Sequence, residues 1–498
     1  MTRFLRRDLY AAAAAALLVT AAVLTGRHIQ DTRHTLFVHW PPVLAEWDPH
    51  VGPGTPAALA VAAATVAYGP AVAARLRWRT MLAGAWAAAL AWILSLALVD
   101  GWQQGIASKL TGHNEYLRVI GRFHDIPAAL RDFTHHIVSG TPEPWPAHVA
   151  GHPPLATVTF VLLDRVGLRG GGWAGMWCIT VGATGCVAVL VAIRALAGET
   201  LARRAAPFLV LAPAAVWMGA SADAYFAAVA AWAVGLLALA VTGRSPAWAA
   251  VSGLLFGLTC YLSYGLTLFA LIGAAVLVLG RQGVRDRPAV LPALLAGLAV
   301  IPVVLTLVGF DWWEAYRLLI TRYYQGVGGI RPYAYWVWAN LACTVLITGL
   351  ATAAGLRRTA AELLRRRDAD AGREETAEGN GSTRGTRETT VEGTDRATRA
   401  RAGEANGERA GEANGERTHK ATGEAAARFR LAVLVAAALL ALLAADLSGM
   451  SKAETERIWL PFALWLLPAC AFLPRPRVWL AAQAVLALLL NHLLLTGW

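Results

Sequence analysis

Long apolar stretches, separated by short polar connections, follow one another along almost the whole of this 498-residue chain. A helix that crosses a bilayer needs about 20 predominantly apolar residues. Stretches near that length recur throughout, so the pattern predicts an all-α, polytopic membrane protein with about 13 transmembrane helices. The expected spans are residues 9–25, 56–74, 81–99, 174–196, 205–220, 222–242, 248–263, 265–280, 289–309, 336–355, 429–446, 458–473 and 478–496.

The apolar stretch 153–168 does not fit this series. It begins with two prolines, is short, and carries an acid and a base, Asp164 and Arg165. If it crossed the bilayer, the basic pair Arg203 and Arg204 would fall outside, against the positive-inside rule. We therefore expect a re-entrant or interfacial segment, with a full crossing as the alternative.

Arginine dominates the short connections between the expected spans. Because cytoplasmic loops carry an excess of Lys and Arg, we expect the following groups on the cytoplasmic side: Arg3/Arg6/Arg7, Arg75/Arg77/Arg79, Arg203/Arg204, Arg244, Arg281/Arg285/Arg287 and Arg475/Arg477. Residues 26–54, 100–152, 311–335 and 448–457 then face outside with the C-terminus, in a plasma membrane. The first span resembles a signal sequence but lacks a clear small-x-small cleavage site, so we expect a retained anchor.

Residues 357–428 have a different composition. They contain 15 Lys+Arg against 14 Asp+Glu and few large apolar residues, and RAGEANGE occurs twice in tandem. Such a nearly neutral polyampholyte buries too little surface to offset chain entropy. We expect a disordered cytoplasmic loop whose first arginines touch anionic headgroups. The chain thus divides into N-terminal spans (1–99), an extracytoplasmic loop (100–152), a transmembrane core (153–356), this loop, and C-terminal spans (429–498).

The overall composition agrees with a membrane protein. Hydrophobic residues form 57% of the chain and charged residues 15%, against about 25% charged residues in soluble domains. The net charge of +12 is explained by topology and lipid contact rather than by nucleic acid. All five cysteines lie in apolar segments, which leaves no disulfide framework or zinc spacing in the outer loops. No Walker A loop is present, so a nucleotide-driven pump is not expected.

The polar loop 100–155 concentrates ionisable side chains at one membrane surface. It holds six of the twelve histidines and five carboxylates, and it ends in a His-Pro-Pro-Leu sequence that begins at His152. Glu115 stands in its first half, and His148 shortly precedes His152. A carboxylate near a membrane surface can act as a general base, although an isolated loop glutamate is more often simply solvated. The histidine spacing matches no tight metal-binding motif.

Two further sets of polar residues border apolar segments. Asp223 lies between two apolar stretches, where a charge is costly unless it meets water, a partner or a cavity; a helix cap is the simpler alternative. Lys452 and Arg457 stand just outside a span. Arg binds a phosphate bidentately and Lys supplies a point charge, whereas interfacial anchoring, with Trp459 in the aromatic belt, is the alternative.

Residues 311–336 combine eight Trp and Tyr with three arginines. Aromatic platforms beside cations suit sugars or phosphate headgroups. Plain interfacial anchoring explains them equally well.

The order of these features resembles the GT-C glycosyltransferases, within them the branch of protein O-mannosyltransferases and aminoarabinose transferases. Asn114-Glu115-Tyr116 falls where that branch has an acidic pair followed by Tyr, and His152-Pro153-Pro154-Leu155 falls where it often has Lys-Pro-Pro-Leu. Asp223 after a short helix and the Glu456–Pro461 sequence also have counterparts. The resemblance covers residues 81–280 and 445–475.

This resemblance implies an integral membrane glycosyltransferase that moves a sugar from a polyprenyl-phosphate donor to an acceptor hydroxyl on the outer face. Glu115 would be the catalytic base, and Asp223 would hold the acceptor or a divalent cation. Four residues would contact the donor: Tyr116, His152, Lys452 and Arg457. A transporter or lipid flippase and a non-catalytic scaffold are the alternatives; no pair of matching broken helices in two halves supports the former.

Overall fold

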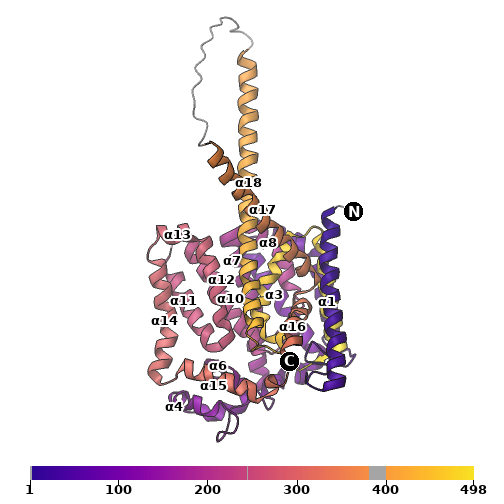
Figure 1. Cartoon of the computed structure of the whole chain (residues 1–498), viewed down its shortest axis with the longest axis vertical. Helices are drawn as coiled ribbons and strands as arrows, with labels where there is room; N and C mark the ends of the chain where they lie inside the picture. The colour runs from indigo at the N-terminus through magenta and orange to yellow at the C-terminus, as the bar shows by residue number, and fades with distance from the viewer. Residues whose placement is uncertain (1–2, 244, 381–399, 498) are drawn as a thin grey trace.

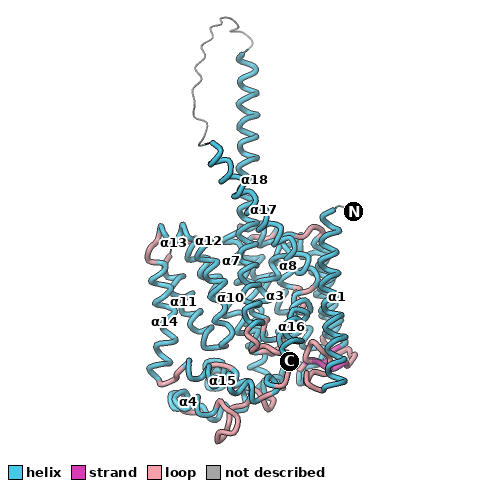
Figure 2. Tube along the Cα trace, in the orientation of Figure 1, coloured by secondary structure: helices cyan, strands magenta, loops and turns pink. Residues whose placement is uncertain are grey.

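The computed structural model describes the backbone of residues 3–243, 245–380 and 400–497, and the side chains of 5–243, 245–367 and 421–497. Most of the described chain is helical (Figure 1 and Figure 2). Seven helices are long and apolar enough to cross a membrane, or up to eight if one bent pair is a single span. The seven are α1 (Arg3–Arg33), α2 (Thr55–Arg75), α3 (Trp78–Ala97), α7 (Gly170–Ala197), α10 (Ala222–Thr242), α14 (Val290–Val308) and α18 (Ala400–Leu447).

Each of these seven helices corresponds to one expected span, with bounds that agree within two residues or extend beyond it, but the full set of about 13 is not confirmed. Some expected spans form shorter apolar helices: α11 (Ala247–Leu262), η6 with α12 (Tyr264–Leu268 and Phe269–Leu279), and α20 with η8 (Leu460–Leu466 and Leu467–Phe472). A run of apolar residues does not by itself distinguish a helix that crosses a bilayer from a shorter one that is buried within a bundle.

Other expected spans are interrupted. Residues 205–220 divide between α8 (Glu199–Val210) and α9 (Ala215–Met218), because Pro213 between them cannot donate a helical hydrogen bond. Residues 336–355 fall on α16 (Tyr333–Thr348) and α17 (Leu350–Asn380), which meet at 107°. Gly349 between these two helices has φ +84°, a conformation that favours glycine. The last expected span corresponds to α21 (Pro476–Leu493).

The basic connections gather at one end of the bundle, here called the arginine-rich end (Figure 1). Arg203 on α8 donates to the carbonyl oxygens of Ala73 and Leu76 after α2, and Arg204 donates to Leu473 before α21. Helix α13 (Arg281–Asp286) and the beginning of α1 lie at the same end. The basic connections that the structure describes share one side of the bundle, as expected. Arg244 lies outside the described residues, and the cytoplasmic location of this end stays a prediction.

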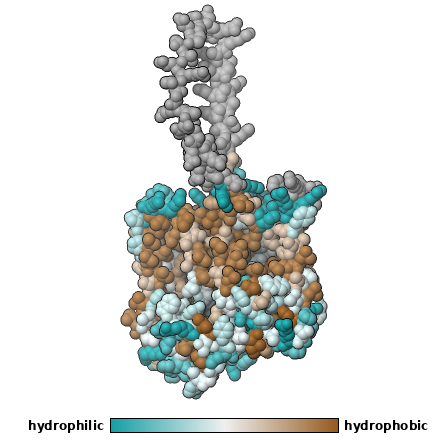
Figure 3. All heavy atoms as spheres, viewed as in Figure 1, coloured by the Kyte–Doolittle hydropathy of each residue, from teal (hydrophilic) through white to brown (hydrophobic). Residues whose placement is uncertain are grey.

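The other end, here called the polar end, carries short helices rather than spans (Figure 1). The segment between α3 and α7 forms η1 (Leu98–Asp100), η2 (Gln103–Ala107), η3 (Lys109–Thr111), η4 (Tyr116–Phe123), α4 (Ile126–Asp132), η5 (Phe133–His136), α5 (Ala147–Gly151) and α6 (Leu155–Arg165). Amphipathic α15 (Trp312–Gln325) and η7 (Val327–Gly329) lie here too. Figure 3 shows a hydrophobic band toward the arginine-rich end and a paler, mixed surface at the polar end, as a partly embedded bundle requires.

Helix α6 occupies most of the stretch 153–168. Its 11 residues rise about 16 Å, roughly half of the ~30 Å hydrocarbon core. One helix of this length does not cross the bilayer, which agrees with our preference against a full crossing; a re-entrant or interfacial placement stays a prediction.

The expectation of disorder over 357–428 does not hold for the described residues. Helix α17 continues to Asn380 and α18 begins at Ala400, while 381–399 lie outside the described residues. Ala, Glu, Leu and Arg are good helix formers and charges can be solvated on a helix, so low hydrophobicity does not preclude helix. Arg357 and Arg358 also pair with buried Asp8 of α1, and Arg428 pairs with Glu362, so the ends of this segment belong to the packed bundle.

Helix α10 is the centre of the bundle, with most of its side chains buried. It packs against α7 through small residues: a Cβ on Gly182 would lie 2.9 Å from the Cβ of Ala224, and one on Gly235 would lie 3.0 Å from the Ala188 carbonyl oxygen. Small residues at these positions let the two backbones approach closely. The polar start of α10, with Asp223, is thereby held inside the protein.

A two-stranded sheet ties the last described residues to the loop after α1. Strand β1 (Ala45–Trp47) pairs antiparallel with β2 (Leu494–Thr496), with Glu46 opposite Leu495. The neighbouring Leu44 donates its backbone N–H to Glu456 Oε1 at 2.9 Å. This sheet therefore joins the loop after α1 to the polar residues before α20.

Candidate functional site

Five of the six residues singled out in the sequence lie together at the polar end. Glu115 and Tyr116 stand at the start of η4, His152 precedes α6, Asp223 lies in the first turn of α10, and Arg457 belongs to α19 (Thr455–Ile458). Hydrogen bonds and ion pairs connect them through His148. Segments more than 300 residues apart in the chain thus form one cluster, here called the polar cluster.

The polar cluster is built around a chain of ionic contacts. Glu115 Oε1 lies 2.7 Å from His148 Nδ1, and His148 Nε2 lies 3.4 Å from Arg457 Nη2. Arg457 Nη1 donates to Asp223 Oδ2 at 2.7 Å, and Glu454 Oε2 lies 3.5 Å from Arg457 Nη2. One guanidinium therefore connects the two acids that the sequence analysis proposed as functional.

His148 is the link between Glu115 and Arg457. Arginine can only donate a hydrogen bond, so His148 Nε2 accepts from Arg457. On the other side of the ring, His148 Nδ1 lies 2.7 Å from Glu115 Oε1. One imidazole therefore touches both the candidate base and the guanidinium.

Local structure explains the position of Asp223. Ser221 is the N-cap of α10, and its Oγ accepts the backbone N–H of Asp223 at 3.3 Å. The alternative in which Asp223 itself caps the helix is wrong, because its side chain is paired with Arg457 instead. A negative charge in the first turn is favoured by the helix dipole. Both partners of this pair are only 5% exposed.

Glu115 is positioned by both backbone and side chain. It precedes η4, where its backbone N–H donates to Gly112. The backbone N–H of His148 donates to the carbonyl oxygen of Asn114 at 3.1 Å, so α5 is held beside the Asn114-Glu115-Tyr116 sequence. Glu115 is 9% exposed and His148 12%, which excludes the simple solvated loop acid that we considered above.

Tyr116 and His152 form the inner wall of the cluster. The Tyr116 hydroxyl lies 3.1 Å from His152 Nδ1, which also lies 2.7 Å from the carbonyl oxygen of His148. Tyr116 stacks on Phe160, with ring centroids 5.3 Å apart. Burial lowers the pKa of His152 from 6.5 to about 4, so this imidazole is neutral near pH 7. His152 therefore offers hydrogen bonds and not the positive charge that a Lys would bring at the same position.

Charge is balanced within the cluster. Burial alone would lower the pKa of Arg457. The charges of Asp223 and Glu454 outweigh this effect and raise that pKa above its usual value. Burial raises the pKa of Glu454, but the charges of Arg457 and Arg331 outweigh it and hold that pKa below its usual value. Arg331 Nη1 lies 3.4 Å from Glu454 Oε1. Asp223 and Glu454 are therefore each paired with a buried arginine, as a low-dielectric interior requires.

Lys452 does not join the polar cluster. Its Nζ donates to the carbonyl oxygen of Gly328 on η7 at 2.9 Å, and its backbone N–H donates to the hydroxyl of Tyr323 at 3.0 Å. Arg331 donates to the carbonyl oxygen of Lys452. Lys452 therefore fastens the loop before α19 to the aromatic segment, and its expected contact with a phosphate is not supported by this geometry.

His148 and Glu454 were not predicted as functional residues. Both are partners of Arg457, and each belongs to a polar stretch that we had noted. Their importance depends on the approach of α5 and α19, which no local spacing reveals. His148 is the residue whose omission matters most, because it is the link between Glu115 and Arg457.

A divalent cation at Asp223 finds no support in the donor set. Within the described parts of the chain, no three His, Cys, Asp or Glu side chains lie together so that they could hold a metal ion. The carboxylate of Asp223 faces a guanidinium, which occupies the place that a cation would take. The pair Asp223–Arg457 is the observed alternative to a metal.

Comparisons with known proteins found no match: no family model, no curated protein and no solved structure is similar to this chain. The chemistry of the polar cluster must therefore be argued from its own geometry. It contains a buried carboxylate in contact with a histidine, a buried guanidinium, and a His–Tyr pair whose imidazole is neutral. These groups can accept a proton from a hydroxyl, bind an anion and hydrogen-bond a polar ligand.

Proposed function

We propose that this chain is a membrane glycosyltransferase of the GT-C type, which transfers a sugar from a polyprenyl phosphate to an acceptor hydroxyl at the polar end. The observation that carries the proposal is the Glu115–His148–Arg457–Asp223 chain of contacts. It joins a candidate base to a candidate phosphate-binding group at the end of a bundle of apolar helices. The order of motifs along the sequence supports the same function.

In the proposed reaction, the acceptor oxygen attacks the anomeric carbon while the bond from that carbon to the lipid phosphate breaks. The proton of the hydroxyl passes to Glu115, and the bonding electrons leave with the phosphate. One oxygen of Glu115 lies 2.7 Å from His148 Nδ1, and in the proposed reaction the other oxygen takes this proton. The sugar is transferred with inversion at the anomeric carbon.

Arg457 is the proposed partner of the lipid phosphate. A guanidinium presents its N–H donors in a planar fork, and this shape binds a phosphate bidentately. Since the cluster is covered, the donor headgroup must displace part of the polar end to reach it. Glu454 is the partner that lies farther from the guanidinium, at 3.5 Å against 2.7 Å for Asp223, so we expect the phosphate to take its place.

His148 is proposed as a positioning residue. It acts through Glu115, which it orients, and through Arg457, from which it accepts. His148→Gln keeps one donor and one acceptor but replaces the ionisable imidazole by a neutral amide. We expect this variant to lower the transfer rate modestly and to change its pH profile, which a purely structural role would leave unaltered.

The test is an assay of purified full-length protein in liposomes with radiolabelled polyprenyl-phosphate mannose and glucose and envelope membranes as acceptor. Glu115→Gln keeps the size of the side chain but accepts no proton, so transfer should fall about 10²–10⁴-fold, with donor binding unchanged. Glu143→Gln is the matched control, because Glu143 is an exposed acid in the same loop. It should transfer sugar at the wild-type rate.

Equal transfer by wild type and Glu115→Gln would exclude Glu115 as the base. If the wild type transfers nothing from either donor but moves labelled lipid across the liposome bilayer, the flippase alternative replaces this proposal. Arg457→Gln separates binding from proton transfer, because it should weaken donor binding rather than alter the pH profile.

A further inference from the structure

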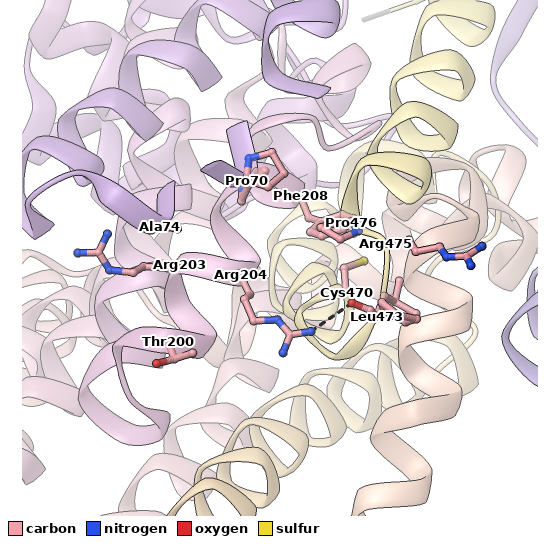
Figure 4. A pocket seen from close by; sticks show the side chains of 12 residues that line it. Pro70, Ala74, Thr200, Arg203, Arg204, Phe208, Cys470, Leu473, Arg475 and Pro476 are labelled. Atoms are coloured by element: carbon pink, nitrogen blue, oxygen red, sulfur yellow. Dashed lines mark hydrogen bonds between the residues drawn. The ribbon is translucent and has the colours of Figure 1, made fainter. Parts of the chain in front are cut away.

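A cavity of about 540 Å³ lies at the arginine-rich end, on the opposite side of the bundle from the polar cluster. It is formed by α2, α8 and the connection between η8 and α21. Its lining includes Pro70, Ala74, Arg204, Phe208, Leu473 and Arg475, all of which are labelled in Figure 4. Nothing in the proposed glycosyl transfer uses this cavity.

The walls of the cavity combine apolar surface with positive charge. Phe208 and Leu473 are buried and supply apolar contact, and the α2 side is formed by Pro70 and Ala74 of a helix whose surface is mostly exposed and apolar. The cavity therefore adjoins the surface that lipid chains would cover. Arg204 and Arg475 are exposed at the same cavity, with Arg204 donating to the Leu473 carbonyl oxygen at 3.2 Å.

The two arginines retain their positive charge without an acidic partner. Among the described side chains, no carboxylate forms an ion pair with Arg204 or Arg475. Burial and the charges of Arg428 and Arg358 lower the pKa of Arg204, as expected for a cation among other cations. Three acids of this end already have arginine partners: Glu199 with Arg194 and Arg203, Asp8 with Arg357 and Arg358, and Glu362 with Arg365 and Arg428.

Arg203 provides an internal comparison. It also lines the cavity, but its guanidinium donates to Glu199 and to the carbonyl oxygens of Ala73 and Leu76. Its donors are used within the protein, where they fasten α8 to the α2–α3 connection. Arg204 has most of its donors left, and Arg475 lies in the left-handed region (φ 54°) between two prolines, at the edge of the cavity.

We propose that this cavity binds an anionic membrane phospholipid, with its phosphate at Arg204 and an acyl chain against Phe208, Leu473 and the exposed face of α2. The exposed side chain of Arg475, at the edge of the cavity, points away from Arg204 in Figure 4 and would turn inward to reach the same phosphate. Guanidinium groups bind phosphate through charge-assisted hydrogen bonds, and basic pockets between membrane helices bind anionic headgroups. The apolar walls favour a lipid over a free phosphate, because only a lipid has an acyl chain that can pack against them. This inference is independent of the proposed glycosyl transfer.

The test is native mass spectrometry and thermal unfolding of the full chain in detergent, with phosphatidylglycerol, phosphatidylcholine or inorganic phosphate added separately. Phosphatidylglycerol should bind to the wild type and raise its unfolding temperature, whereas phosphatidylcholine and inorganic phosphate should do neither. Arg204→Gln and Arg475→Gln should each weaken phosphatidylglycerol binding about five-fold. Arg475→Gln breaks no hydrogen bond that the structure describes, so it remains informative if Arg204→Gln folds poorly.

The matched control is Arg285→Gln, which removes an exposed arginine of α13 at the same end but outside the cavity. It should bind phosphatidylglycerol like the wild type. If Arg475→Gln binds phosphatidylglycerol as well as the wild type, the proposal is wrong. If Arg475→Gln and Arg285→Gln lose the same affinity, the lipid is attracted by the overall positive charge of this end and not by the cavity. Stabilisation by inorganic phosphate alone would overturn the proposal in favour of a free-anion site.

Discussion

The two ends of the bundle treat buried charge in different ways. At the polar end, Arg457 lies between Asp223 and Glu454 and is almost inaccessible to water. At the arginine-rich end, Asp8 is fully buried but its partners, Arg357 and Arg358, still reach solvent. When both partners of an ion pair are buried, removal of one leaves the other charge buried and unpaired, which is strongly destabilising, and the fixed pair can orient reactive groups. When one partner reaches solvent, water can solvate the charge that remains, so removal of the other partner costs less.

Removal of Asp223 is expected to have the largest effect on stability. Asp223→Ala leaves the guanidinium of Arg457 buried without its closest carboxylate, which should cost about 3–5 kcal/mol of unfolding free energy. Replacement of both members, as Asp223→Leu with Arg457→Met, should recover most of this loss because no unpaired charge remains. Chemical unfolding in mixed micelles measures both variants. A double variant as unstable as Asp223→Ala would mean that packing and not charge dominates here.

The pH dependence of stability tests the carboxyl group next to Arg457. Burial raises the pKa of Glu456 to about 7, so the folded protein holds this proton more tightly than the unfolded chain. The resulting stability is fully present below about pH 4.5 and is lost as the pH rises through about 7. Glu456→Gln removes this loss and should stabilise the protein at pH 8 by on the order of 2 kcal/mol. Unfolding curves of wild type and variant at pH 5 and pH 8 should converge at the lower pH; a constant difference between them would contradict the assignment.

Asp8→Ala should cost less than Asp223→Ala, about 2 kcal/mol, although Asp8 is the more deeply buried acid. The charge-assisted hydrogen bonds to Arg357 and Arg358 are lost, but both guanidinium groups can turn to solvent. The same unfolding assay compares the two variants directly. If Asp8→Ala lowers the unfolding free energy more than Asp223→Ala does, the solvent accessibility of the remaining arginine does not explain the difference between the two ends.

The smallest effect is expected at an exposed pair of the polar end. Arg169 lies 3.9 Å from Asp164 and its side chain is 76% exposed. Arg169→Gln should change the unfolding free energy by less than about 0.5 kcal/mol. A larger change would show that proximity to the polar end, rather than burial of the charges, sets the cost of removing them.

Much of the architecture could be predicted from the sequence. Apolar stretches identified the helices of membrane-spanning length, and the arginines correctly predicted which connections share one end. Both signals are local, because burial in lipid and charge placement act on each segment separately. The breaks at Pro213 and Gly349 were missed, since apolar composition alone carries no information on where a helix bends.

Part of the polar cluster could also be predicted from the sequence, because polar residues are unusual beside apolar segments. Glu115, Tyr116, His152, Asp223 and Arg457 stood out as polar residues beside apolar segments, and all five lie together. Their partners His148 and Glu454, and the separate role of Lys452, depend on which side chains face one another once α5, α10 and α19 are packed. The neutral state of His152 likewise follows from its burial, which the loop sequence does not reveal.

The small sheet formed by β1 and β2 implies an order in which parts of the protein assemble during synthesis. Residues 45–47 are made early and leave the ribosome long before residues 494–496, so their pairing must wait for the synthesis of every span described above. Leu44, next to β1, contacts Glu456 beside Arg457. The loop after α1 can thus reach its final place only late in biogenesis. A chain truncated before β2 would insert its helices yet lack this closing contact, and a tag fused there would disturb a region distant from it in sequence.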